Sequence, residues 1–116
     1  SAQNSLRKFA TDVLVPNSDM DVSIMGYTDN QGWRNSTTEQ SREKNQALSY
    51  QRAQSVSNYL MQSGARPAQI REVKGLGEDF PVADNSTAAG KQQNRRVEVY
   101  LYASQQMIKN AEAQAR

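Results

Sequence analysis

The segment from residue 20 to residue 32 constrains the fold most, because an alternating apolar strand ends there in a polar loop bounded by glycines. Apolar and polar side chains alternate over residues 20–25, the pattern of a β-strand with a buried face. The strand leads into G-Y-T-D-N-Q-G at residues 26–32. Because the loop at a strand end presents side chains to a ligand rather than to a core, Asp29 is a candidate binding residue.

Apolar spacing elsewhere predicts two more strands, two helices and a helical turn. Helices that alternate with strands on a small sheet are typical of an α/β (α+β) two-layer sandwich. The predicted elements are a helix over residues 1–14 that ends before Pro16, a helix over 50–63, strands over 70–76 and 97–102, and a helical turn over 88–93.

The helix over 50–63 has clear predicted ends. Ser49 is suited to the N-cap position, and Gly64 to the left-handed position that follows a helix. Before this helix, residues 29–47 are almost wholly polar and predict a long loop, of a length usually found in functional or disordered segments. Trp33 is its only large apolar residue, and the simplest interpretation is a lid residue packed on its own loop.

Composition excludes several classes of function. The 116 residues contain no cysteine and no histidine, which excludes serine–histidine, cysteine–histidine and histidine–metal chemistry. Catalysis by other residues is not excluded by composition, and we expect no metal and no cofactor. A net charge of +2 without a basic run argues against a nucleic-acid partner, and no stretch approaches the roughly 18 apolar residues of a transmembrane helix. The lack of cysteine suits an oxidising compartment.

The length predicts one domain, which we place at residues 1–104. Residues 105–116 form a tail that favours a peripheral or frayed helix. The chain starts at Ser1 without an initiator methionine or a signal peptide, so we expect an excised domain or a processed chain.

Arg52 breaks a local rule. With Ser49 as the N-cap it occupies the third helical position, where a cation opposes the helix dipole at a cost of about 0.3–1 kcal/mol. Such a violation marks a candidate functional site, although a pairing with Glu43 would explain it equally well. If Asp29 and Arg52 meet at one rim, they form either a surface salt bridge or a recognition pair for a zwitterion, with Asp29 on the ammonium and Arg52 on the carboxylate.

Two adjacent arginines precede the last strand. Arg96 shares a strand face with Glu98, two positions on, and we expect the two to pair. Arg95 points the other way or toward the rim. There it is either a solvated charge or a second positive group beside Asp29.

Several separated motifs together resemble the OmpA-like peptidoglycan-binding domain of outer-membrane protein A, peptidoglycan-associated lipoprotein and flagellar motor protein B. They span about residues 6–102 and occur in the family's order. The motifs are G-Y-T-D-N-Q-G at 26–32, N-Q-A-L-S-Y-Q-R-A-Q-S-V at 45–56, G-L-G at 75–77, Pro81, and N-R-R-V-E at 94–98.

The resemblance implies a small mixed sheet covered by helices, and a periplasmic domain that binds the peptide stem of peptidoglycan without a covalent bond. In that family the aspartate and arginine at the positions of Asp29 and Arg52 hold the amino and carboxylate groups of diaminopimelate. The positions of Thr28, Asn45, Leu48 and Arg95 line the same pocket. The resemblance also allows a homodimer or an envelope protein as partner.

The sequence departs from the family pattern in two ways. The segment between Gly32 and Asn45 is longer than usual and contains Trp33 and Arg34, which cover the pocket, extend the contact to the glycan, or do neither. The strand with which the family's fold opens would precede Ser1, so an unpaired sheet position is expected here.

Three functions therefore remain. The favoured one is a non-enzymatic module that anchors an outer-membrane protein or lipoprotein to the cell wall. The second is an envelope assembly module with an idle pocket. The third and least favoured is a wall hydrolase with Asp29 and either Glu39 or Glu43 as acid and base.

Overall fold

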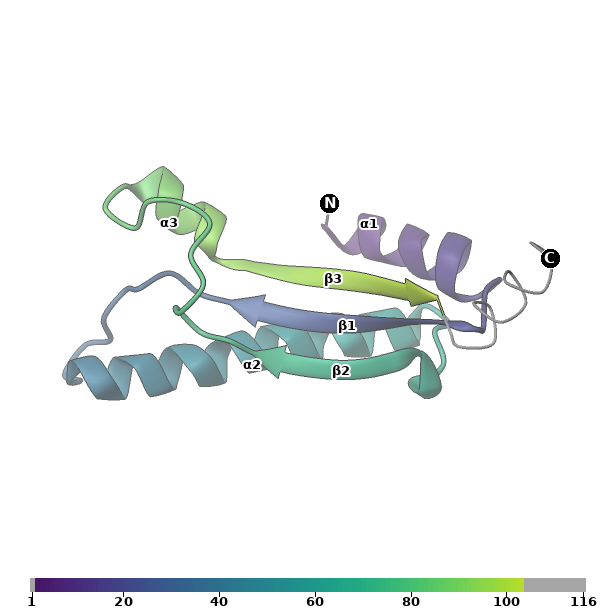
Figure 1. Ribbon diagram of the computed structural model, residues 1–116, viewed down its shortest axis with the longest axis horizontal. Coiled ribbons are helices and arrows are strands. Elements are labelled where there is room, and N and C mark those ends of the chain that lie inside the picture. Colours follow the sequence, from purple (N-terminus) through teal and green to yellow (C-terminus); the bar gives the residue numbers. More distant parts are fainter. Residues whose placement is uncertain (1, 104–116) are drawn as a thin grey trace, which may run out of the picture.

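Three strands form the sheet of the computed structural model, which describes residues 2–103 (Figure 1). β1 (Met20–Tyr27) is central, with β2 (Ile70–Gly75) parallel on one side and β3 (Arg96–Ala103) antiparallel on the other. The three predicted strands are thus confirmed within one residue at most ends. The sheet is mixed, as the family resemblance implies.

The helices of the core pack on one face of this sheet. α1 (Ala2–Phe9) continues into a π-helical turn, η1 (Ala10–Leu14), and α2 (Thr38–Gln62) runs behind the strands in Figure 1. A 3₁₀ turn, η2 (Pro67–Gln69), precedes β2, and α3 (Ala88–Asn94) precedes β3. This arrangement confirms the α/β two-layer sandwich, and α3 confirms the predicted helical turn.

α2 is much longer than predicted. The apolar repeat did not reveal its first turns, because they contain almost no apolar residue. It begins after Thr37, whose hydroxyl accepts the Gln40 N–H at 3.0 Å, while the Gln40 side chain accepts the Thr37 N–H at 2.9 Å. This reciprocal capping box fixes the start of the helix. The predicted loop over 29–47 is therefore wrong beyond residue 37, and Ser49 is not an N-cap but lies fully buried within α2.

A stripe of small residues faces the sheet along α2, so that the helix lies close to the strands. A Cβ atom on Gly26 would lie 2.0 Å from the backbone oxygen of Ser49, and one on Gly75 would lie 2.5 Å from the backbone nitrogen of Tyr50. The glycines at these two strand ends therefore permit the close approach. The buried residues of the stripe are Ser41, Asn45, Ser49, Ala53, Ser57 and Leu60.

The apolar core lies at the other end of α2, between this helix, η1 and the sheet. Gly64, which follows the end of α2, has a φ of +115°, as the sequence predicts. The Ala65 N–H bonds back to the Leu60 carbonyl at 3.0 Å. The fully or nearly buried apolar residues are Ala10, Leu14, Val22, Ile24, Ala53, Leu60 and Ala65.

Both β2 and β3 are edge strands of the sheet formed by residues 2–103. No described segment occupies the position of the strand that opens the family's fold. Leu101 of β3 is 42% exposed. The tail prediction for residues 105–116 and the domain boundary at 104 lie outside the described residues.

Candidate functional site

A polar cavity of about 400 Å³ opens where the carboxyl end of β1 meets α2 and the start of β3. Its position, at the end of the central strand, agrees with the sequence-based choice of Asp29. All six predicted site residues line it. The full lining is Thr28, Asp29, Gln31, Gly32, Trp33, Asn45, Leu48, Arg52 and Arg95.

The loop after β1 holds Asp29 in a fixed orientation. Thr28 and Asp29 are 4% and 5% exposed, and the Thr28 N–H bonds to the Gly77 carbonyl at 2.9 Å. The Gln31 N–H donates to Asp29 Oδ1 at 2.9 Å, which forms an Asx turn. The carboxylate is therefore set by the loop before any ligand arrives.

Asp29 pairs with Arg95 and not with Arg52, contrary to the simplest form of the prediction. Arg95 Nη1 lies 2.5 Å from Asp29 Oδ2, and the two side chains are 42% and 7% exposed. Arg95 follows α3 directly, so this short helix positions its side chain at the cavity. The second positive group that the sequence suggested is present, and it neutralises Asp29.

Arg52 lies in the middle of α2, so the argument from the helix dipole in a first turn is wrong. It does not pair with Glu43, which lines other hollows. Within residues 2–103 its guanidinium has no hydrogen-bond or ion-pair partner, although it is half-buried at the cavity wall. A partly desolvated guanidinium without a partner is suited to a bidentate bond with a ligand carboxylate.

Asn45 connects the two sides of the cavity. Its Oδ1 accepts the indole N–H of Trp33 at 2.8 Å. Its Nδ2 donates to the Gln31 carbonyl at 3.2 Å and to Glu78 Oε2 at 3.1 Å. The side chain is thus fully occupied in holding the loop to α2, and we assign it a positioning role.

The cavity is positively charged overall. Asp29 contributes one negative charge, and Arg52 and Arg95 contribute two positive charges. Lys91 lies just outside and donates to Gln31 Oε1 at 2.9 Å. Such an arrangement attracts an anionic group.

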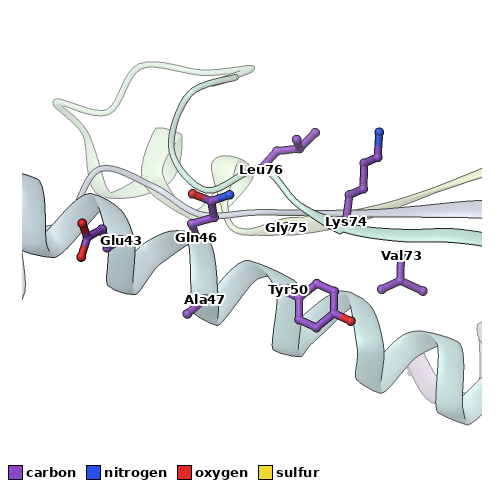
Figure 2. Close-up of a pocket in the computed structure, with 8 residues that line it drawn as sticks. All are labelled: Glu43, Gln46, Ala47, Tyr50, Val73, Lys74, Gly75 and Leu76. Atoms are coloured by element: carbon purple, nitrogen blue, oxygen red, sulfur yellow. The ribbon is translucent and has the colours of Figure 1, made fainter.

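Further hollows lie along α2. Figure 2 shows one of about 630 Å³, where Tyr50 of α2 faces Val73 of β2 while Lys74 points away from the helix. A smaller hollow is lined by Glu39 and Glu43 and does not include Asp29, so the acid–base pair required for a hydrolase is not brought together.

No three acidic, histidine or cysteine side chains of residues 2–103 cluster so as to hold a metal ion. No helix in the same range has the length and apolar character needed to cross a bilayer.

Fold and cavity together define a small α/β domain with a charged binding pocket at the end of its central strand. Residues 1–95 match the model of the OmpA family. The chain belongs to this family, as its motifs predicted.

Known relatives support this assignment. The chain is 45% identical over 80 residues to the probable lipoprotein YiaD of Escherichia coli, covering 69% of this chain and 32% of YiaD. It is 40% identical over 102 residues to the outer-membrane lipoprotein YfiB of Pseudomonas aeruginosa, covering 88% and 55%. The chain thus spans about a third to a half of these curated relatives.

Among solved structures, the fold is similar to the peptidoglycan-associated lipoprotein of Burkholderia pseudomallei. The TM-score is 0.74 at 31% sequence identity, covering 86% of this chain and 76% of that chain.

Proposed function

We propose that this domain binds peptidoglycan non-covalently through the diaminopimelate of its peptide stem. Arg52 receives a carboxylate of the ligand in a bidentate contact, and Asp29 receives an ammonium group. Thr28, Leu48 and Arg95 complete the pocket, and Asn45 holds its two sides together. The observation that supports this most is the unpaired guanidinium of Arg52 at the wall of a cavity that also contains a buried carboxylate.

The pairing of Asp29 with Arg95 shapes the binding step. A ligand ammonium can share the Asp29 carboxylate with Arg95 or displace the Arg95 side chain, which is 42% exposed and free to move outward. The displaced guanidinium then faces a second carboxylate of the ligand. A molecule with both charges in close proximity therefore fits the cavity better than a simple anion.

We further propose that the domain is a non-catalytic anchor in the periplasm. It would tether an outer-membrane protein or lipoprotein to the cell wall. Two observations support this: the structurally similar protein from Burkholderia is named a peptidoglycan-associated lipoprotein, and Asp29 is separated from Glu39 and Glu43, which line a different hollow.

The test is retention on purified diaminopimelate-containing peptidoglycan, with affinity for the free stem peptide measured by calorimetry. Arg52→Ala should weaken binding by about 10- to 100-fold, because charge-assisted hydrogen bonds contribute roughly 1.5–3 kcal/mol. Arg52→Lys should recover only part of the affinity, since an ammonium lacks the planar fork.

Lys8→Ala is the matched control, since it removes one positive charge from an exposed position of α1 far from the cavity. It should bind like the wild type. Equal binding by Arg52→Ala and the wild type would reject the site. No heat with the stem peptide from a folded wild-type domain would instead favour an assembly module with an idle pocket.

A further inference from the structure

Trp33, the one tryptophan of the chain, lies at the mouth of the cavity. It lines the cavity and yet remains 41% exposed. It belongs to the segment between Gly32 and Asn45, which is longer than is usual for the family. A large aromatic surface left open beside a binding cavity is more informative than scattered surface apolar residues, because aromatic rings dominate contact energies.

Two hydrogen bonds hold Trp33 in place. The backbone N–H of Trp33 donates to the Ser41 hydroxyl at 2.9 Å, and the indole N–H donates to Asn45 Oδ1 at 2.8 Å. Both partners are buried residues of α2. The polar edge of the indole is therefore satisfied within the protein, and its exposed surface is pre-ordered, which lowers the entropy cost of binding.

We propose that Trp33 forms a second subsite that stacks on a sugar ring of the glycan, next to the pocket for the peptide stem. This inference rests on the proposed function, because the peptide in the cavity brings the sugar to the mouth. One face of a pyranose ring consists mainly of C–H groups and packs on an aromatic plane, while its hydroxyls point outward around the rim.

Polar groups around Trp33 suit those hydroxyls. The Lys44 ammonium lies over the indole ring, 5.6 Å from its centre, and donates to the Ser36 hydroxyl at 2.7 Å. Arg52 and Asp29, which are proposed to hold the carboxylate and ammonium of the peptide, line the same cavity. The cavity thus combines charged side chains for the peptide with an aromatic surface, flanked by polar groups, for a sugar.

The experiment compares two ligands that share one peptide: a disaccharide-tetrapeptide from diaminopimelate-containing peptidoglycan, and the matching free tetrapeptide. Wild-type protein should bind the disaccharide form more tightly. Trp33→Ala should weaken binding of the disaccharide form by about three- to tenfold more than it weakens binding of the free tetrapeptide, so that the preference for the sugar disappears.

Two further variants separate stacking from loop support. Trp33→Phe keeps a flat ring but cannot donate to Asn45, and it should retain most of the preference for the disaccharide form. Tyr50→Ala removes a similarly exposed ring, 44%, from the hollow of Figure 2, and both affinities should stay as in the wild type.

An equal loss for both ligands in Trp33→Ala would show that Trp33 only supports the loop, and would overturn the inference. An unchanged preference for the disaccharide form would overturn it as well. In both cases the peptide pocket would stand, because wild-type binding of the free tetrapeptide reports on it separately. If the wild type binds neither ligand, the proposed function fails, and the sugar subsite fails with it.

Discussion

At the scale of single residues, glycines at two strand ends decide how closely α2 approaches the sheet. Neither Gly26 nor Gly75 needs its glycine for an unusual backbone angle, since neither has a positive φ. Each is needed because backbone atoms of α2 occupy the space of a Cβ atom. The arrangement also places Arg52 and Asn45 of α2 beside the loop that contains Asp29.

Gly26→Ala is expected to destabilise the domain by about 1–3 kcal/mol, because the new methyl group would meet the backbone of Ser49 and α2 must shift. Urea denaturation measures the change. Gly32→Ala is the control, since the nearest atom to its Cβ would be Ser41 Oγ at 3.9 Å. A Gly26→Ala variant as stable as Gly32→Ala would contradict the close packing described above.

Asn94 gives a second prediction at this scale. It is fully buried, and its Oδ1 accepts the N–H groups of Val82 and Ala83 at 2.8 and 3.0 Å, while its Nδ2 donates to the Ala83 carbonyl at 3.0 Å. Asn94→Ala removes these part-buried bonds, and a hydrogen bond contributes a net of about 0.5–1.5 kcal/mol. The midpoint of urea denaturation should fall accordingly, and a midpoint equal to that of the wild type would refute the role of Asn94.

At the scale of elements, α2 shows where prediction from the sequence fails and why. The apolar repeat of its second half, with Leu60 in the core, was predicted correctly. In its first half, Ser41 and Asn45 bond to the loop after β1 and Ser49 packs on the strand ends. A repeat of small polar residues does not differ from a polar loop in hydrophobicity. The T-T-E-Q sequence at 37–40 was the available signal, since it forms the capping box.

Thr37→Ala should fray the first turns of α2, because it removes the side-chain acceptor for the Gln40 N–H. The expected loss of stability is about 1 kcal/mol, with faster amide hydrogen exchange over residues 40–44. Thr38→Ala, at the next and exposed position, should be neutral or slightly stabilising, since alanine favours a helix interior. Similar exchange in both variants would show that the cap does not fix this end.

At the scale of the whole molecule, the motifs were more informative than local patterns. The three strands and the two-layer fold could be predicted from apolar alternation and the order of the elements, and the six cavity residues because the motif order ties distant segments to one family. The partner of Asp29 could not, since the choice between Arg52 and Arg95 depends on where α3 ends in space. Nor could the bonds of Asn45 to Trp33 and Glu78, because they link segments far apart in the sequence.

Stability should depend on pH through the open face of the sheet. The hydroxyl of Tyr100, and then Arg96 at 2.6 Å, hold the pKa of Glu98 below its ordinary value of 4.5. Because folding lowers this pKa, the stabilisation is present above pH 4.5 and is lost as the pH falls through the folded-state value.

The stability of Glu98→Gln should therefore decline less than that of the wild type on acidification below pH 4.5. Urea denaturation at several pH values measures it, and Tyr100→Phe should reduce the decline in the same direction by removing the donor. An undiminished decline in Glu98→Gln would show that other carboxyl groups control the acid response.

The length of α2 has a consequence for selectivity. Asn45, Leu48 and Arg52 lie on one continuous helix, so the seven residue steps from Asn45 to Arg52 span about 10 Å that cannot stretch or shorten. This wall of the cavity has a fixed length, whereas the exposed Arg95 side chain on the opposite wall can adjust its position. Under the proposed function, a ligand must therefore fit the fixed wall of α2, and Arg95 adjusts to it from the opposite side.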